Sequence, residues 1–498
     1  MNVNPITRLD YPDLDVIRVE DTYYMVSTTM HFMPGCEILQ SFDLVHWEHV
    51  TYVYETLDHT DAQQLKSGQN IYGQGMWAAS LRYHEGRFYI CFVANDTRKT
   101  YLYTSEKIDG PWKKQLIEGF YHDGSLLFDE DGRSYIVYGN DEIWITELNE
   151  DLTAPKKDGL HRLLVSDHKN PELGYEGSHI QKINGYYYIF LVHSLRDRWM
   201  RTEACFYSDS LEGEFTGGDV LCDDRGYCGQ GVAQGGIVDT PDGKWYAMLF
   251  QDSGAVGRIP ILLPVTWKDH FPFFGQNGHV PEEIEVHSTR PGYIYQPLVG
   301  SDDFCNGLLP RWQFNHDPDP RYYHLDALQG TYTITTREVC TELTQAVNTL
   351  TQRMSYPSCA AEVTVDASAL KEGDVAGLCA LQSCYAAVGI TKHHGKYEVL
   401  MLDKKEDGIL DMTEGTVVES HQMDFRLEAD FCNMKDEARC YYRVNKGDWL
   451  PIGNVHKLYF KLDHFTGCRF GLFCYAAEET GGSACFRDFK YYDVDEIS

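Results

Sequence analysis

A hairpin turn that leads into an aromatic strand is expected at Asp131-Gly132-Arg133-Ser134-Tyr135, and this pattern occurs five times in the first half of the chain. In each copy a turn with Asp, Asn or Gly precedes aromatic residues and then an aliphatic stretch, which is typical of a tight turn followed by a half-buried strand. The other copies are Glu20-Asp21-Thr22-Tyr23-Tyr24, Glu85-Gly86-Arg87-Phe88-Tyr89, Asn184-Gly185-Tyr186-Tyr187-Tyr188 and Asp242-Gly243-Lys244-Trp245-Tyr246.

The spacing of the five copies indicates the architecture. Their last tyrosines are 46 to 65 residues apart, about the length of one four-stranded propeller blade. The 34 Tyr, 23 Phe and 43 Gly of the chain agree with this, because aromatic side chains suit pleated sheets and Gly suits tight turns. The sequence therefore predicts an all-β protein in which residues 1–285 form a five-bladed β-propeller rather than a helical solenoid.

The second half of the chain lacks this repeat. After Pro281 an acidic stretch leads into a segment with Pro and Gly, which we interpret as a linker over residues 286–301. Short alternating strands resume from residue 302, for example at 457–462 and 469–473. About 200 residues of strand and turn without the propeller pattern predict a β-sandwich accessory domain over residues 302–498.

Composition limits the classes of partner. The formal net charge is −32, from 75 Asp and Glu against 43 Lys and Arg, so neither nucleic acid nor a membrane surface is expected as a partner. No apolar run approaches the roughly 18 residues of a membrane span, and the first ten residues show no secretory signal. The 15 Cys contain no CxxC pair and no zinc spacing. These features predict a cytoplasmic protein and leave its oligomeric state open.

One position in each repeat carries unusual side chains. Asp13 lies eleven residues before the last Tyr of the first copy, and the residues twelve before the other tyrosines are Trp77, Asp123, Glu176 and Gln234. If these residues begin the innermost strands, five equivalent side chains converge on the propeller axis. Three carboxylates in one place are costly to ionise together, and such clusters mark candidate active sites. The alternative is an ordinary turn or capping role for each acid.

The three acids suit glycoside hydrolysis. One carboxyl can protonate the leaving oxygen while another activates water, and a third can tune the acid. The sequence contains no G-x-S-x-G motif, and neither a P-loop nor a dinucleotide fingerprint follows a predicted strand. Serine-based acyl transfer, phosphoryl transfer and hydride transfer therefore lack support.

The sequence resembles glycoside hydrolase family 43 over essentially its full length. The matching motifs lie at residues 4–5, 10–17, 77–82, 122–126 and 176–180. The resemblance implies that Asp13 is the general base, Asp123 the pKa modulator and Glu176 the general acid of an inverting enzyme, with about 6.5 to 9.5 Å between base and acid. It also implies a concanavalin-like sandwich that packs against the propeller, with one loop able to shape the substrate pocket.

The chain departs from the family pattern at two positions. Leu14-Asp15 replaces the usual Pro-Ser, which puts a second acid on the strand face of Asp13; we retain Asp13 as the base. Gln234 stands where many family members have a His that holds a divalent cation. An amide oxygen can still help to bind calcium, so Gln234 is a candidate metal ligand, although the proposed chemistry does not require a cation.

Three further residues are expected to bind the sugar. By the resemblance, Phe32 forms the wall of the first sugar subsite, Trp77 its floor, and Arg258 approaches both the sugar and the base. The alternatives are a core Trp for Trp77 and a surface salt bridge for Arg258.

The expected function is that of an inverting exo-acting glycosidase. It would release terminal α-L-arabinofuranosyl or β-D-xylosyl residues from hemicellulose oligosaccharides of xylan or arabinoxylan, so its partners are small oligosaccharide substrates. Two alternatives stay open: an endo-arabinanase or other glycosidase on the same propeller, and a noncatalytic carbohydrate-binding protein. An appended sandwich that blocks one end of a cleft favours exo action, and the presence of all three acids favours an enzyme.

Overall fold

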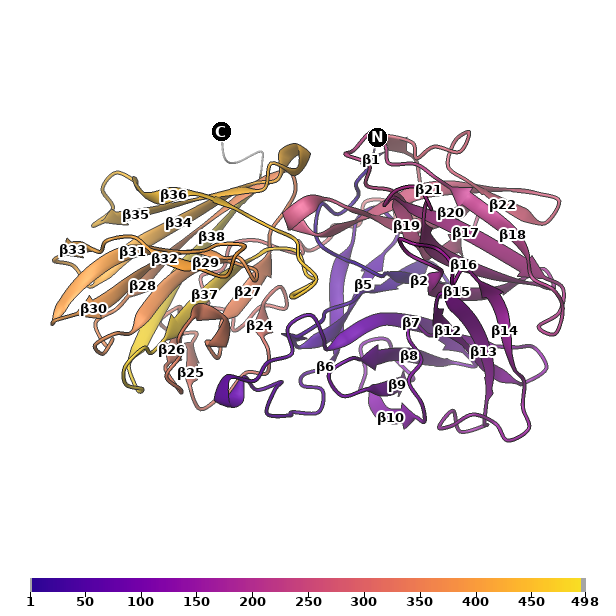
Figure 1. Cartoon of the computed structure of the whole chain (residues 1–498), viewed down its shortest axis with the longest axis horizontal. Helices are drawn as coiled ribbons and strands as arrows, with labels where there is room; N and C mark the ends of the chain where they lie inside the picture. The colour runs from indigo at the N-terminus through magenta and orange to yellow at the C-terminus, as the bar shows by residue number, and fades with distance from the viewer. Residues whose placement is uncertain (1, 494–498) are drawn as a thin grey trace.

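The computed structural model describes residues 2–493, which form two β domains side by side (Figure 1). The predicted all-β architecture, a five-bladed propeller followed by a β-sandwich, is confirmed. The described residues contain no helix with the length and apolar character of a membrane span. The helices within this range are short 3₁₀ turns: η1 (Lys66–Gly68), η2 (Gly254–Val256), η3 (Leu343–Gln345) and η4 (Cys432–Met434).

Each blade is a four-stranded antiparallel sheet. Blade one contains β2 (Asp15–Val19), β3 (Thr22–Val26), β5 (Gly35–Ser41) and β6 (Glu48–Tyr54). Blade two contains β7 (Met76–His84), β8 (Arg87–Ala94), β9 (Lys99–Ser105) and β10 (Lys113–Ile117). Blade three contains β11 (Ser125–Phe128), β12 (Ser134–Asn140), β13 (Glu142–Leu148) and β14 (His161–Ser166). Blade four contains β15 (Glu176–Ile183), β16 (Tyr186–Ser194), β17 (Arg201–Ser208) and β18 (Thr216–Leu221), and blade five contains β19 (Val232–Asp239), β20 (Trp245–Asp252), β21 (Arg258–Lys268) and β22 (Phe271–Phe274).

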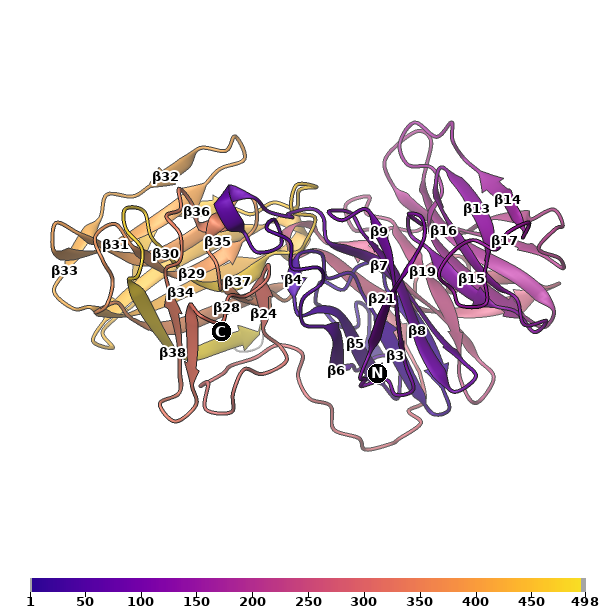
Figure 2. The same cartoon turned by 90° about the horizontal axis from the view of Figure 1, so that it is seen from below.

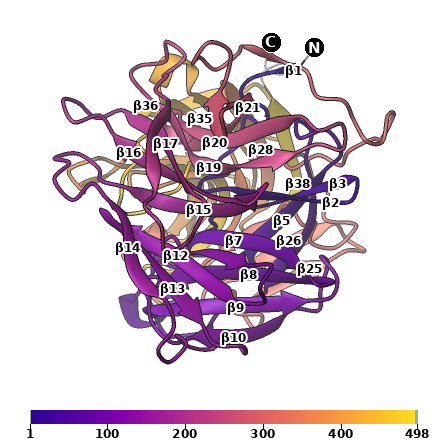
Figure 3. The same cartoon turned by 90° about the vertical axis from the view of Figure 1, so that its right-hand side faces the viewer.

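The first strand of each blade lies nearest the propeller axis. In Figure 3, β7, β15 and β19 lie toward the middle of the propeller, whereas β10 and β14 lie toward its rim. The first strands of neighbouring blades, including β2 with β7 and β19, also contact one another. The five repeated tyrosines all lie on the second strand of their blade, where they pair with the first strand. The repeat in the sequence is therefore the inner hairpin of each blade.

The start of the chain closes the ring on blade five. β1 (Asn2–Val3) pairs with β23 (Glu283–Ile284), which follows the last blade. The Asn4 side chain donates to the carbonyls of Leu262 and Pro281 and accepts the Leu262 N–H at 3.0 Å. These contacts hold the segment that leads to Asp13 against the last blade.

The second domain consists of two packed sheets (Figure 1). The nine-stranded sheet contains β32 (Leu410–Met412), β31 (Lys396–Lys404), β30 (Ala386–His393), β29 (Val375–Leu381), β37 (Arg469–Tyr475), β27 (Leu350–Arg353), β24 (Gln313–Asn315), β4 (Phe32–Met33) and, beside β31, β33 (Thr416–Val418). The seven-stranded sheet contains β25 (Tyr323–Asp326), β26 (Thr331–Thr335), β38 (Ser483–Asp493), β28 (Ser358–Asp366), β34 (Gln422–Asp430), β35 (Glu437–Val444) and β36 (Leu450–Lys457). Alternating burial along β34 directs one face of this sheet into the shared core, where Leu378, Phe425 and Leu472 pack.

The two domains are joined by more than the linker. β4 leaves blade one between β3 and β5 and pairs with β24 of the sandwich, with Phe32 opposite Asn315 and Met33 opposite Phe314 (Figure 2). A buried ion pair also crosses the interface, with Glu37 Oε2 2.8 Å from Arg353 Nη1. The propeller thus supplies an edge strand and a buried charge to the sandwich.

Candidate active site

The first strand of each blade is preceded or interrupted near the axis by one residue with left-handed backbone. These residues are Asp13 (φ 50°), Ala78 (φ 34°), Asp123 (φ 48°), Gly177 (φ 67°) and Gln234 (φ 66°). Each lies four positions before the residue that pairs with the repeated Tyr. In blades two, four and five the register also shifts at this point, as at a β-bulge. This is the structurally equivalent position of the five blades.

The prediction that Trp77 and Glu176 share this position is wrong by one residue. The inner hairpin has a two-residue turn in blades one, two and four but a five-residue turn in blades three and five, as the flanking pairs show. A count of twelve residues back from Tyr therefore reaches one residue too far in blades two and four. Trp77 and Glu176 instead correspond to His122, the residue before Asp123.

Asp13 is held by two neighbours. Its carboxylate accepts the Thr28 hydroxyl at Oδ2 (2.7 Å) and Arg258 Nη1 at Oδ1 (2.9 Å). Asp13 is 8% exposed and Arg258 is 2% exposed. The predicted approach of Arg258 to Asp13 is therefore present in the structure, and the surface salt bridge considered for Arg258 is not.

Asp123 and Glu176 both approach one nitrogen of the His122 ring. His122 Nε2 is 3.6 Å from Asp123 Oδ2 and 3.6 Å from Glu176 Oε2. Asp123 Oδ2 also accepts the Gly177 N–H at 3.0 Å, and Asn140 Nδ2 donates to Glu176 Oε2 at 2.8 Å. The Glu176 carboxylate is partly exposed, so a substrate can reach it.

Burial and the neighbouring charges shift the pKa values of Asp123 and His122. Burial raises the pKa of Asp123 to about 6, and the negative charges of Glu176 and Asp13 add to the rise while His122 opposes it. The negative charge of Asp123 is the main cause that raises the pKa of His122 to about 9; Glu176 adds to it and burial opposes it. At neutral pH the site therefore contains an imidazolium close to both acids.

The second acid of blade one has a different environment. Asp15 is 1% exposed and its carboxylate accepts Arg82 Nη1 (2.7 Å) and the Leu81 N–H (2.8 Å), and it meets His179 Nδ1 at 3.1 Å. Burial acts to raise the pKa of Asp15, but Arg82 and His179 outweigh it and lower that pKa to about 2. Asp15 is thus fully engaged in a buried cluster that closes the axis, which supports Asp13 rather than Asp15 as the base.

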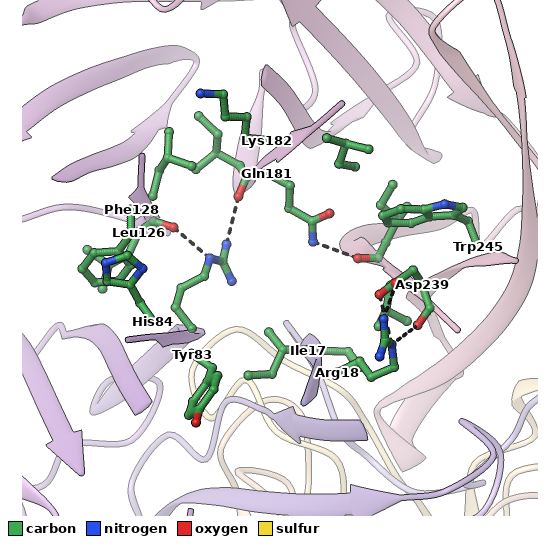
Figure 4. Close-up of a pocket in the computed structure, with 17 residues that line it drawn as sticks. Ile17, Arg18, Tyr83, His84, Leu126, Phe128, Gln181, Lys182, Asp239 and Trp245 are labelled. Atoms are coloured by element: carbon green, nitrogen blue, oxygen red, sulfur yellow. Dashed lines mark hydrogen bonds and ion pairs between the residues drawn. The ribbon is translucent and has the colours of Figure 1, made fainter. Parts of the chain in front are cut away.

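A cavity of about 400 Å³ lies at the other end of the inner strands (Figure 4). Its walls come from the first strands of all five blades and from Trp245. The charged side chains there are paired: Arg82 with Asp15, Arg18 with Asp239 and Lys182 with Asp129. This cavity therefore does not repeat the carboxylate arrangement of Asp13, Asp123 and Glu176.

The two aromatic residues that were predicted to bind the sugar lie in different places. Trp77 lies near the acids, 6.2 Å from the His122 ring. Phe32 is buried at the domain interface in β4, in a cluster with Leu343 and Phe473, and the Arg469 guanidinium lies 3.5 Å from its ring centre. The predicted place of Phe32 in the wall of a sugar subsite is therefore wrong, because the loop that carries it joins the sandwich sheet.

A residue of the sandwich takes part in the site. Phe465 lies in the loop before β37, with its ring centre 5.5 Å from Trp77 and 4.3 Å from the Arg258 guanidinium. Sequence reasoning did not identify Phe465 or His122. The position of His122 directly before Asp123 was a usable signal, whereas nothing in the repeat points to Phe465.

The cation ligand predicted at Gln234 lies at the axis. Gln234 is 5% exposed, and its backbone N–H donates to the Glu203 carboxylate at 2.7 Å. A small cavity of about 10 Å³ is lined by residues that include Gln234, Asp13, Asp15 and Asp123. A cavity of this size has room for about one water molecule or ion, and the Gln234 amide oxygen is a ligand type that suits a hard cation. Separately, ligand atoms of His122, Asp123 and Glu176 lie within 4.8 Å of one another.

The fold and the site together define a propeller-type glycoside hydrolase with three acids at one end of its axis. Residues 3–272 match the family model described as "Glycosyl hydrolases family 43", and residues 301–492 match "Beta xylosidase C-terminal Concanavalin A-like domain". The chain belongs to glycoside hydrolase family 43. The predicted family and its concanavalin-like second domain are confirmed.

The similarity to individual relatives extends along the whole chain. A beta-xylosidase of Formosa agariphila is 26% identical over 99% of this chain and 89% of its own length. A xylosidase/arabinosidase of Butyrivibrio fibrisolvens is 23% identical over 99% of both chains. A solved structure described as a bifunctional GH43-CE protein of Bacteroides eggerthii is 42% identical with a TM-score of 0.93 and covers the whole chain. This chain spans 64% of the length of that protein.

Proposed function

We propose that the protein is an inverting exo-acting glycosidase that releases terminal β-D-xylosyl or α-L-arabinofuranosyl residues from hemicellulose oligosaccharides. The observation that carries the proposal is the set of Asp13, Asp123 and Glu176 at one end of the axis, with Arg258 on Asp13. The names of the relatives, a beta-xylosidase and a xylosidase/arabinosidase, support the substrate class.

The geometry supports one role for each acid. Arg258 and Thr28 fix the direction of the Asp13 carboxylate, which suits a base that must take a proton from one water molecule. Glu176 is more exposed than Asp123 and suits the acid that meets the leaving oxygen. Above about pH 6 Asp123 carries its charge and favours the proton on Glu176.

Exo action is supported by the sandwich. Phe465 and Trp77 enclose the site from two domains, and an enclosed site suits a chain end better than the middle of a polymer. Neutral oligosaccharides are also consistent with the net charge of −32. We propose cytoplasmic action on imported substrates, in agreement with 15 free cysteines. Cell fractionation tests this location.

The experiment that tests the activity compares 4-nitrophenyl β-D-xylopyranoside with 4-nitrophenyl α-L-arabinofuranoside, using Asp13→Asn as the inactive control. We expect turnover of at least one substrate by the wild type, and proton NMR of the first-formed sugar should show the inverted anomer. Oligosaccharides instead of monosaccharide from linear arabinan would favour the endo-arabinanase. Binding of xylobiose without any turnover would favour the noncatalytic protein.

A cation at Gln234 is a separate part of the proposal. Gln234 would act as one oxygen ligand beside the axial carboxylates, and the ion would add positive charge near the acids. Exhaustive chelation is expected to lower the melting temperature, and added calcium is expected to restore it. An unchanged melting temperature and an unchanged activity after chelation would contradict the proposal of a bound cation.

A further inference from the structure

Asp10 lies where three segments meet. The side chain is buried, with Oδ1 accepting the backbone N–H of Arg258 at 2.7 Å and Oδ2 accepting that of Gly467 at 2.8 Å. Arg258 begins β21 of the propeller, whereas Gly467 belongs to the sandwich loop before β37. One carboxylate, three residues before Asp13, thus joins the two domains at the site.

The fit around this carboxylate requires glycine on both sides. A Cβ atom on Gly257 would lie 2.3 Å from Asp10 Oδ1, and a Cβ on Gly467 would lie 2.9 Å from Asp10 Cβ and 2.1 Å from the Val256 carbonyl. Gly257 also has a φ of 107°, which side chains disfavour. The two backbones therefore approach Asp10 closely enough for direct hydrogen bonds.

The sandwich loop continues the contacts to the base. Phe465, two residues before Gly467, lies on the Arg258 guanidinium at 4.3 Å. Arg258 in turn donates to Asp13 at 2.9 Å. A second backbone bond, from Cys468 N–H to the Ala255 carbonyl at 2.8 Å, holds the same loop on the propeller. The path from Asp10 to Asp13 therefore runs through both domains.

We propose that Asp10 is a positioning residue that makes the sandwich loop part of the catalytic centre, by holding Phe465 against Arg258 and so Arg258 on Asp13. Its kinetic consequence rests on the proposed function, but its contacts do not. Only a carboxylate presents two acceptors to two N–H groups; an Asn side chain would turn an NH₂ group toward one of them. A conservative Asp10→Asn substitution therefore breaks one of the two bonds.

Hydrogen exchange tests the anchor without any substrate. Loss of a hydrogen bond to a charged acceptor is expected to speed exchange of the amides at 465–468 roughly 10- to 100-fold in Asp10→Asn. The matched control is Asp317→Asn, because Asp317 meets His59 at 2.7 Å across the same domain interface. The control should leave exchange in the loop and kcat/KM within about twofold of wild type. Should Asp10→Asn fail to fold, Gly467→Ala opens the same junction from the sandwich side.

Kinetics test the coupling to the base. Displacement of a positioning contact by about 1 Å costs up to roughly 10²-fold, so Asp10→Asn should lower kcat/KM by about 10- to 100-fold. In a Phe465→Ala background the same substitution should cost less than in the wild type, because Phe465 provides one of the two routes from Asp10 to Arg258, the other being the direct bond from the Arg258 N–H. Unchanged loop exchange, or an equal loss in both backgrounds, would overturn the inference. If the wild type hydrolyses no glycoside while loop exchange responds as expected, the proposed function fails and the anchor stands.

Discussion

The acid and the base differ in what they require of the leaving group. An alkoxide needs a proton as the glycosidic bond breaks, whereas an acidic phenol hardly does. Glu176→Ala should therefore lose much more activity on xylobiose than on a 4-nitrophenyl glycoside. Asp13→Ala should lose about 10² to 10⁴-fold or more on both, because water must be deprotonated whichever group leaves. Equal losses for Glu176→Ala on the two substrates would contradict the assignment of the acid.

The imidazolium of His122 gives the site a pH dependence of its own. Its pKa of about 9 keeps it charged at neutral pH, 3.6 Å from both Asp123 and Glu176. A nearby positive charge favours loss of protons from acids, so His122→Asn should move the alkaline limb of the kcat/KM profile to higher pH by about one unit. Asp123→Asn removes a negative charge and should move the same limb to lower pH. Shifts in the same direction would contradict this account.

The inner hairpins show which part of the fold is visible in sequence. Turn residues and period-two strands are local, so five copies predicted five blades correctly. Turn length is local too, but its effect on the register appears only when the strands pair. The predicted equivalent positions at Trp77 and Glu176 were therefore wrong by one residue. Phe32 and Phe465 depend on how a propeller loop and a sandwich loop dock. Such contacts join residues hundreds of positions apart and leave no periodic pattern in one chain.

The left-handed residues of the axis show how an element serves the site. Asp13, Ala78, Asp123 and Gln234 hold positive φ without being glycine, at a cost of about 1 to 3 kcal/mol each. The paired strands on either side of each residue maintain this conformation. This conformation orients the side chains, because the turn of the backbone brings side chains from the first strands toward one axis.

The buried cluster below the acids is expected to contribute strongly to stability. Asp15→Asn leaves Arg82 without its charged partner, which typically costs about 3 to 5 kcal/mol. Because the pKa of Asp15 is lowered to about 2, its contribution is complete above about pH 4 and is lost as the pH falls toward 2. Melting temperatures of wild type and Asp15→Asn should therefore differ widely at pH 7 and converge as the pH falls from about 4 toward 2. A constant gap would contradict the ion-pair origin.

At the scale of the whole molecule, the two domains are expected to unfold together. β4 is a strand of the sandwich sheet supplied by blade one, and Asp10 and Phe465 connect the same two domains at the site. Separation of the domains would expose these surfaces to water. Unfolding of one domain therefore removes interface contacts that stabilise the other. The catalytic centre is accordingly a property of the docked pair and not of the propeller alone.

The Glu37–Arg353 pair provides a test of this coupling. Both side chains are almost fully buried, and Glu37 also meets His49 at 3.1 Å. Arg353→Met removes the guanidinium partner of the buried Glu37 carboxylate and leaves His49 as its remaining partner, which should cost about 3 to 5 kcal/mol. Calorimetry should show one transition for the wild type and a lower or split transition for Arg353→Met. Adding Glu37→Gln should recover part of the loss, because the buried charge is then removed. Two well-separated transitions in the wild type, with only the sandwich transition moved by Arg353→Met, would show that the domains are energetically independent.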